Sequence, residues 1–194
     1  MKAMHALYML PYLIKKVRFS SKPTKRVNSS NASQLLPFFK DALHVYSYEN
    51  MNFYLGSAFN SIQSKPYNLH INCASSEIPA YNNAINIDWK DTDDIAVHER
   101  QLNMMLEAVK ELQETQDIVH ILFTCWAGAS RSVGALIYVL DGLNQPSTEE
   151  PCDRFDKLYT HLRSVKPSIN ISTALRRYVI QTMQKATTSK YIDL

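Results

Sequence analysis

One eight-residue segment combines a thiol, small residues, an arginine and two serines. It reads Cys125-Trp126-Ala127-Gly128-Ala129-Ser130-Arg131-Ser132. Gly128 and the alanines beside it allow the backbone to curl tightly, so that successive N–H groups can point inward and bind an anion. Arg131 adds a planar fork of donors that fits two oxygens of a phosphate. The segment therefore predicts a phosphate-binding loop, in which the residues from Trp126 to Arg131 hold the anion.

Cys125 is the predicted nucleophile of this loop. A free thiol has a pKa of about 8.5, and a helix N-terminus or a nearby cation lowers that value. A helix that begins near Ser130, together with Arg131, would supply both influences. The hydroxyl of Ser132 can reach the sulfur and stabilise it as a leaving group. We therefore expect a thiolate that attacks phosphorus, with Cys125, Arg131 and Ser132 as catalytic residues.

Two apolar stretches flank the loop and would position it. Residues 118–124 are short, β-branched and free of Gly and Pro, which predicts a buried strand. Residues 133–143 have the length of a helix and repeat apolar residues on one face. The cysteine would then lie at the C-terminal end of a buried strand, where open α/β sheets bind their ligands.

The rest of the pattern predicts a single α/β domain. Further strands are expected at residues 43–48, 52–55, 68–73 and 84–88. Helices are expected at 95–116, between 146 and the Lys166-Pro167 stop, and after 172. The expected fold is a central, mostly parallel sheet of four to five strands flanked by helices. The length of 194 residues, 45% of them hydrophobic, suits one domain at 41–186, with an arm and linker at 1–40 and a short tail at 187–194.

The loop matches the signature C-x5-R-[ST], and three other segments fit the same family. Residues 52–58 read NFYLGSA and resemble its early strand and turn. Residues 71–74 read INCA and resemble a strand end, and Lys166-Pro167 lies where Arg-Pro is common. On these residues the chain resembles the dual-specificity branch of the cysteine-dependent protein phosphatases, over roughly residues 41–185. The resemblance implies hydrolysis of phosphotyrosine and phosphoserine/threonine on proteins through a cysteinyl-phosphate, with no metal or organic cofactor.

The proposed reaction needs a general acid, and the segment after the strand at 84–88 carries several carboxyl groups. Asp91 is the first choice, because Trp89-Lys90-Asp91 resembles the Trp-Pro-Asp loop of the tyrosine-specific branch. Asp88 is the alternate. A carboxylic acid on a movable loop can protonate the leaving oxygen and then act as a base toward water. The same acidic run also suits the cap and first turn of the following helix, so that a purely structural role for Asp91 stays open.

Two positions depart from the family pattern. The family has His directly before the nucleophile, where it orients the loop and lowers the thiol pKa, but this chain has Thr124. The family also has Pro-Asn where this chain has Ile171-Ser172, and we expect Ser172 to replace part of the bonding to the loop. These departures lower the expected activity. They keep a second function open, a catalytically weak or inactive pseudophosphatase that binds phosphorylated partners.

A third interpretation keeps the loop but changes the substrate to a phosphoinositide or an RNA 5′-triphosphate. Phosphatases of those kinds usually carry extra basic residues inside the loop. Here Trp126, Ala127 and Ala129 are apolar, which argues against both substrates. A phosphorylated protein is therefore the expected partner, and the net charge of +3 is too small to argue for nucleic acid.

Residues 1–40 are rich in Lys and Arg, contain no acidic residue and carry an apolar stripe that Pro11 interrupts. Three interpretations of this arm stay open. It packs on its own domain or on a second copy of the chain, it rests on a membrane surface, or it is a mitochondrial transit peptide. The three cysteines are few and irregularly spaced, which favours a reducing compartment. A cytoplasmic location is therefore expected, with the mitochondrion as the alternative.

Overall fold

The computed structural model describes residues 42–57, 67–75, 84–87, 89, 95–145 and 147–189. Its strands are β1 (Leu43–Tyr48), β2 (Met51–Ser57), β3 (Leu69–Asn72), β4 (Ala84–Asn86) and β5 (Val119–Cys125). They form one five-stranded sheet in the order β1-β2-β5-β3-β4. Only the β1–β2 pair is antiparallel, and the other neighbours run parallel. The predicted α/β fold with a mostly parallel sheet is confirmed.

The strand β5 is the centre of this sheet, with β2 on one side and β3 on the other. It is buried along nearly its whole length, because both of its edges are paired and both of its faces are covered. Such a strand reads as a continuous apolar run, as residues 118–124 do. The predicted strand and the observed one differ by a single residue at each end, and Cys125 is the last residue of β5.

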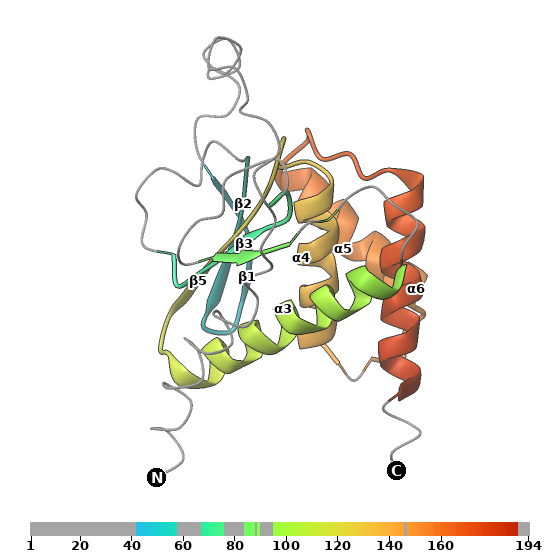
Figure 1. Ribbon diagram of the computed structural model, residues 1–194, viewed down its shortest axis with the longest axis horizontal. Helices are drawn as coiled ribbons and strands as arrows, with labels where there is room; N and C mark the ends of the chain where they lie inside the picture. Colours follow the sequence, from blue (N-terminus) through green and yellow to red (C-terminus); the bar gives the residue numbers. More distant parts are fainter. Residues whose placement is uncertain are drawn as a thin grey trace.

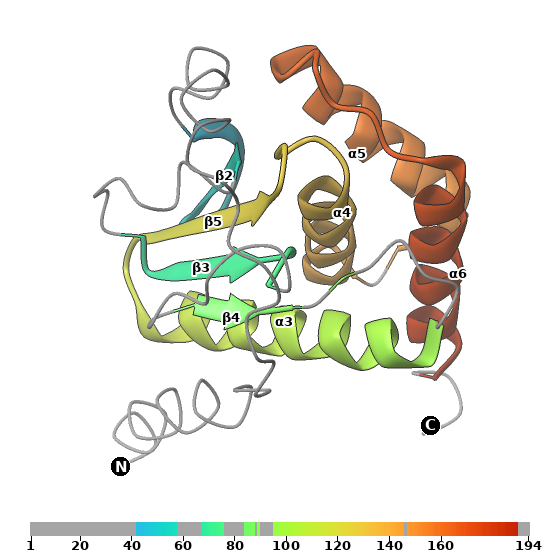
Figure 2. The same ribbon diagram turned by 45° about the horizontal axis from the view of Figure 1, so that its top comes forward.

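Four helices complete the described domain: α3 (Ile95–Thr115), α4 (Arg131–Leu143), α5 (Pro151–Val165) and α6 (Thr173–Ser189). The helix α4 contacts β5, α3, α5 and α6. Figure 1 shows α4 between the sheet and the pair formed by α5 and α6. Figure 2, in which the carboxyl end of β5 points toward α4, shows the same order of layers. Because α4 is enclosed in this way, its residues from Ser132 to Asp141 are all buried.

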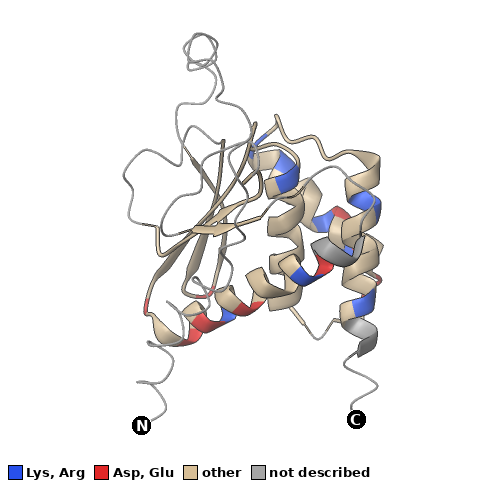
Figure 3. Ribbon diagram, in the orientation of Figure 1, with Lys and Arg blue, Asp and Glu red and all other residues tan. Residues whose placement is uncertain are grey.

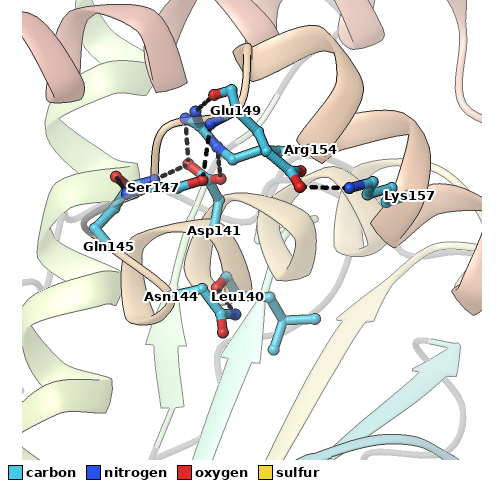
Figure 4. Close-up of polar contacts among 8 residues, drawn as sticks. All are labelled: Leu140, Asp141, Asn144, Gln145, Ser147, Glu149, Arg154 and Lys157. Atoms are coloured by element: carbon cyan, nitrogen blue, oxygen red, sulfur yellow. Dashed lines mark hydrogen bonds and ion pairs between the residues drawn. The ribbon is translucent and has the colours of Figure 1, made fainter.

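A buried ion pair joins α4 to α5. The Arg154 Nε atom donates to Asp141 Oδ1 over 2.6 Å, and Arg154 Nη2 donates to Asp141 Oδ2 over 3.3 Å. Both side chains are only 7% exposed. Arg154 also donates to the Glu149 carbonyl, and Gln145 donates to Asp141 (Figure 4). These bonds satisfy both buried charges and fix the start of α5 against the end of α4.

Several predicted features lie outside the described residues. The arm at 1–40 and both candidate acids, Asp88 and Asp91, belong to this group. The helix α6 continues to Ser189, into the span that the sequence suggested as a tail. Within the described ranges, no helix is both long and apolar enough to cross a membrane.

Candidate functional site

The predicted phosphate loop begins at the carboxyl end of β5 and ends where α4 starts, at Arg131. Gly128 has a φ of +65°, in the left-handed region that favours glycine. A Cβ atom on Gly128 would lie 2.5 Å from the Gly56 carbonyl oxygen at the end of β2. The loop therefore turns sharply and packs backbone to backbone on the neighbouring strand, which no residue with a side chain could do at this position.

The outer side of the loop is held by the connection between α5 and α6. The ammonium group of Lys166 donates to the Gly128 carbonyl over 2.8 Å, and the Asn170 N–H donates to the Ala129 carbonyl over 3.0 Å. In a planar peptide the C=O and the following N–H point in opposite directions. Two consecutive carbonyls directed outward therefore turn the next two N–H groups toward the inside of the loop, as an anion nest requires.

Cys125 lies at the floor of this nest, with its side chain only 2% exposed. Burial by itself would raise the thiol pKa. The Ser132 hydroxyl, the backbone N–H groups of Ser132 and Ser130, and the Arg131 charge together outweigh that effect and lower the pKa of Cys125. The Ser132 Oγ atom lies 3.2 Å from Cys125 Sγ. The arrangement favours a thiolate, which is the nucleophilic form of cysteine.

Arg131 links the loop to the segment that carries the candidate acids. Its Nη1 atom donates to the Trp89 carbonyl over 3.1 Å. Trp89 is 2% exposed and packs edge-on against Tyr178 of α6, with the ring centroids 6.0 Å apart. This buried anchor fixes the residue that stands between Asp88 and Asp91 in the sequence. Both aspartates lie outside the described residues, so the choice between them stays a prediction.

The other predicted loop residues differ in exposure. Ala127 is exposed, whereas Trp126 is half-buried and packs against the hydrophobic core. Figure 3 shows a basic residue at the start of α4, beside the loop, while acidic residues gather on α3. The loop therefore combines exposed and half-buried apolar residues with one positive charge, which suits an anionic group on an apolar or aromatic carrier.

Ser172 has a different role from the expected one. Its Oγ atom accepts the Leu175 N–H over 3.2 Å and caps the first turn of α6. The bonds from this connection to the phosphate loop come instead from Lys166 and Asn170. Sequence comparison drew attention to Lys166-Pro167, but the target of the lysine is set by how α5 packs beside the loop.

Two residues of the β3 segment contact Thr124 of β5: His70 lies within the strand, and Cys73 lies just after its end. The His70 Nε2 atom lies 2.8 Å from Thr124 Oγ1, and the Cys73 N–H donates to the Thr124 carbonyl over 2.7 Å. Burial raises the pKa of the Cys73 thiol, and the Cys125 charge raises it further. Strand periodicity places His70 on one face of its strand but gives no register with β5, so the sequence did not identify the contact with Thr124.

Comparison with known proteins identifies the fold. No protein-family model matches the chain, and no curated protein matches it. Solved structures do match, among them a leucine rich repeat and phosphatase domain containing protein from Entamoeba histolytica. That match has 12% identity and a TM-score of 0.57, over 77% of this chain and 94% of the other. The chain has the dual-specificity phosphatase fold.

Two further structures with this fold differ in what they are described to do. OH1 from the Orf virus, described as a tyrosine phosphatase with triple substrate specificity, is 14% identical with a TM-score of 0.52, over 93% of this chain and 99% of that one. A human tyrosine phosphatase-like serine/threonine/tyrosine-interacting protein is 15% identical with a TM-score of 0.53, over 79% and 99%. The dual-specificity phosphatase fold thus includes a protein described as an enzyme and one described by its interactions.

Proposed function

We infer that the protein is a cysteine-dependent protein phosphatase that hydrolyses phosphotyrosine and phosphoserine/threonine through a cysteinyl-phosphate. One observation carries this conclusion. The Cys125 thiol, with a lowered pKa, lies in a nest of loop amides beside the Ser132 hydroxyl and the Arg131 guanidinium. A buried structural cysteine needs none of these groups. A nucleophile that attacks a bound phosphate needs all of them.

In the first step, the loop amides and Arg131 hold the equatorial phosphate oxygens while charge redistributes over them. The Cys125 sulfur donates an electron pair to phosphorus, and the bond between phosphorus and the ester oxygen breaks. The departing oxygen takes a proton from a carboxylic acid, for which Asp91 is the first candidate and Asp88 the second. The bond from Arg131 to the Trp89 carbonyl supports this choice of segment, because Trp89 is within two residues of both aspartates.

In the second step, water attacks phosphorus and gives a proton to the same carboxylate. The electrons of the sulfur–phosphorus bond return to sulfur, and inorganic phosphate leaves. Cys125 is then a thiolate again, and the Ser132 hydroxyl stabilises its charge at a distance of 3.2 Å. Neither step requires a metal or an organic cofactor.

The second candidate is a phosphatase-like module that binds phosphorylated partners with little or no turnover. The residue before Cys125 favours it, because Thr124 has no ring that could carry a charge. The His70 ring that bonds to Thr124 is also neutral near pH 7, since burial lowers its pKa to about 4. The nest around Cys125 is compatible with either candidate, because binding and attack use the same amides.

Hydrolysis of an aryl phosphate by the purified chain, with vanadate as a competitor, separates the two candidates. We expect Cys125→Ser to abolish turnover and to retain binding of a phosphate analogue, while Cys152→Ser leaves both unchanged. Cys152 is the matched control because it is an exposed thiol on α5. Turnover that survives in Cys125→Ser would refute the nucleophile. Saturable vanadate binding without turnover in the unchanged chain would establish the binding module instead.

The general acid is tested in the same assay. Loss of a general acid costs about 10²–10⁴ in rate, and we expect Asp91→Ala to show that loss. If Asp88→Ala shows it and Asp91→Ala does not, the role belongs to Asp88. If neither substitution changes the rate, neither Asp88 nor Asp91 is the general acid.

A further inference from the structure

His70 and Thr124 form a polar pair directly beneath the candidate nucleophile. His70 is in β3 and Thr124 is in β5, two adjacent parallel strands in which Asn72 is the residue opposite Thr124. His70 and Thr124 therefore project from the same face of the sheet, one diagonal step apart. Their side chains meet over 2.8 Å between Nε2 and Oγ1. Cys125, the next residue along β5, projects from the opposite face into the loop.

The bond between His70 and Thr124 is important because the Thr124 hydroxyl is buried. Thr124 is completely buried, and a buried hydroxyl without a partner costs free energy. Burial lowers the pKa of His70 to about 4, so that its ring is neutral near pH 7 and has one donor and one acceptor nitrogen. A neutral ring can bond to a threonine hydroxyl in either tautomer. The pair is thus a neutral hydrogen bond between a half-buried ring and a buried hydroxyl, and it adds no charge to the thiol.

The two polar groups of Thr124 on the β3 side, its hydroxyl and its carbonyl, both form hydrogen bonds. The side chain bonds to His70, and the carbonyl accepts the Cys73 N–H over 2.7 Å. On the other side of β5, Gly56 and Ser57 of β2 pair with Thr124 and Cys125. The peptide that joins Thr124 to Cys125 is therefore fixed from both edges, and the direction of the Cys125 side chain depends on it.

We propose that His70 is a positioning residue, which acts through the Thr124 hydroxyl to aim Cys125 into the loop amides. A histidine from the neighbouring strand thereby supplies the orienting contact that the residue at 124 does not make by itself. The proposed orientation of the Cys125 sulfur rests only on the geometry of the described residues. The effect of that orientation on turnover rests on the proposed phosphatase function.

The contact between His70 and Thr124 also explains why a histidine at position 124 would not improve this site. The His70 imidazole occupies the space next to the Thr124 hydroxyl, and Thr124 has no exposed surface. A second imidazole at 124 would overpack this site. Thr124→His alone should therefore destabilise the chain, although the usual family pattern has histidine there.

The test measures the pKa of the Cys125 thiol from the pH dependence of its alkylation by iodoacetamide. Mass spectrometry of the peptide that contains Cys125 keeps its signal apart from those of Cys73 and Cys152. Two variants break the pair and keep its shape, His70→Phe and Thr124→Val. His70→Gln keeps a side-chain donor and is the rescue variant. His120→Phe is the matched control, because His120 lies on the same face of β5 and bonds to Tyr54 over 3.1 Å.

We expect His70→Phe and Thr124→Val each to slow alkylation about threefold at a pH below the thiol pKa, the effect of losing one buried hydrogen bond that holds the thiolate geometry. The double variant should be no slower than either single variant, because both remove the same bond. His70→Gln should recover most of the rate, and His120→Phe should leave it unchanged.

Equal alkylation profiles for the unchanged chain and His70→Phe would overturn the proposal, whatever the loss of thermal stability. Additive slowing in the double variant would also overturn it, because the two residues would then act separately. If His70→Phe does not fold, Thr124→Val against Thr124→Ser gives the same comparison from the other partner. The alkylation rate does not require turnover, so failure of the proposed function and failure of this proposal give different results.

Discussion

The hydroxyl of Ser132 lies 3.2 Å from the sulfur of Cys125, in the buried first turn of α4. Ser132 has no exposed surface, and Cys125 is 2% exposed. A hydrogen bond to a charged group is worth about 1.5–3 kcal/mol. This contact is therefore strong enough to oppose the cost of burying a thiolate, together with the loop amides and Arg131.

Ser132→Ala should raise the thiol pKa by about one to two units, the equivalent of that hydrogen bond. The folded environment lowers the pKa of Cys125, so the thiolate persists to a lower pH than in an ordinary cysteine and is lost as the pH falls through the folded value. The pH profile of alkylation should shift to higher pH in the variant. Release of phosphate from the phosphocysteine should also slow, which a pre-steady-state burst would reveal.

Ser130→Ala is the control for this prediction, because Ser130 acts on the sulfur through its backbone N–H, which the substitution keeps. An equal pKa rise in Ser130→Ala and Ser132→Ala would show that the Ser132 hydroxyl has no specific part.

Gly128→Ala should distort the loop strongly, although the substitution adds only one methyl group. Alanine at a φ of +65° costs about 1–2 kcal/mol, and its methyl group would also meet the Gly56 carbonyl at 2.5 Å. We expect weaker vanadate inhibition by at least about tenfold, the equivalent of that strain, together with a lower melting temperature. Gly134→Ala is the control. Its Cβ would lie 3.4 Å from Leu175 and Val179 of α6, which is an ordinary van der Waals distance between two packed helices. Similar losses in both variants would contradict the role of Gly128.

Lys166→Met should weaken the phosphate site without changing the fold. Burial lowers the pKa of Lys166, an effect that the Cys125 charge opposes, and its ammonium donates to the Gly128 carbonyl over 2.8 Å. Methionine keeps the length of the side chain and removes both the charge and the bond. A charged hydrogen bond is worth about 1.5–3 kcal/mol, so vanadate should bind roughly tenfold more weakly or worse.

Lys157→Met removes an exposed lysine of α5 that pairs with Glu149, and it should leave vanadate inhibition unchanged. Equal inhibition constants for the Lys166 and Lys157 variants would mean that the contact with Gly128 does not shape the loop.

Loss of one member of the Asp141–Arg154 pair should destabilise the fold strongly, whereas replacement of both members should be tolerated. Asp141→Leu leaves a guanidinium buried without its carboxylate, which typically costs about 3–5 kcal/mol. Replacing both residues, as Asp141→Leu with Arg154→Met, should recover most of that loss because no charge is left buried. Urea unfolding gives the comparison. The exposed pair of Lys157 and Glu149 is the reference, and Lys157→Ala should cost less than about 1 kcal/mol. A double variant as unstable as Asp141→Leu would refute this account.

Local pattern was enough to predict the framework of the site. A run of β-branched residues before Cys125 and a helix-length apolar run after it fixed the strand, the loop and the helix in order, because propensity and periodicity act over neighbouring residues. Gly128 was identified for the same reason, since a tight loop between a strand and a helix needs a left-handed residue. The expected strands and helices together predicted the α/β class.

The partners of that framework depend on contacts between residues far apart in the chain. The contacts of His70 with Thr124, of Lys166 with Gly128, and of Arg131 with the Trp89 carbonyl arise only after strand register and helix packing are set. Alternation along a strand tells which residues share a face, but not which residue of the next strand lies opposite, so the sequence could not pair His70 with Thr124.

The sequence by itself determined that a thiol, an arginine and a serine would meet in one loop, because those residues are joined by a few peptide bonds and the loop geometry is local. Tertiary structure alone decided what holds that loop and how the thiol is aimed. Those bonds come from β2, β3 and the connection between α5 and α6, which reach the loop only through the packing of the whole domain.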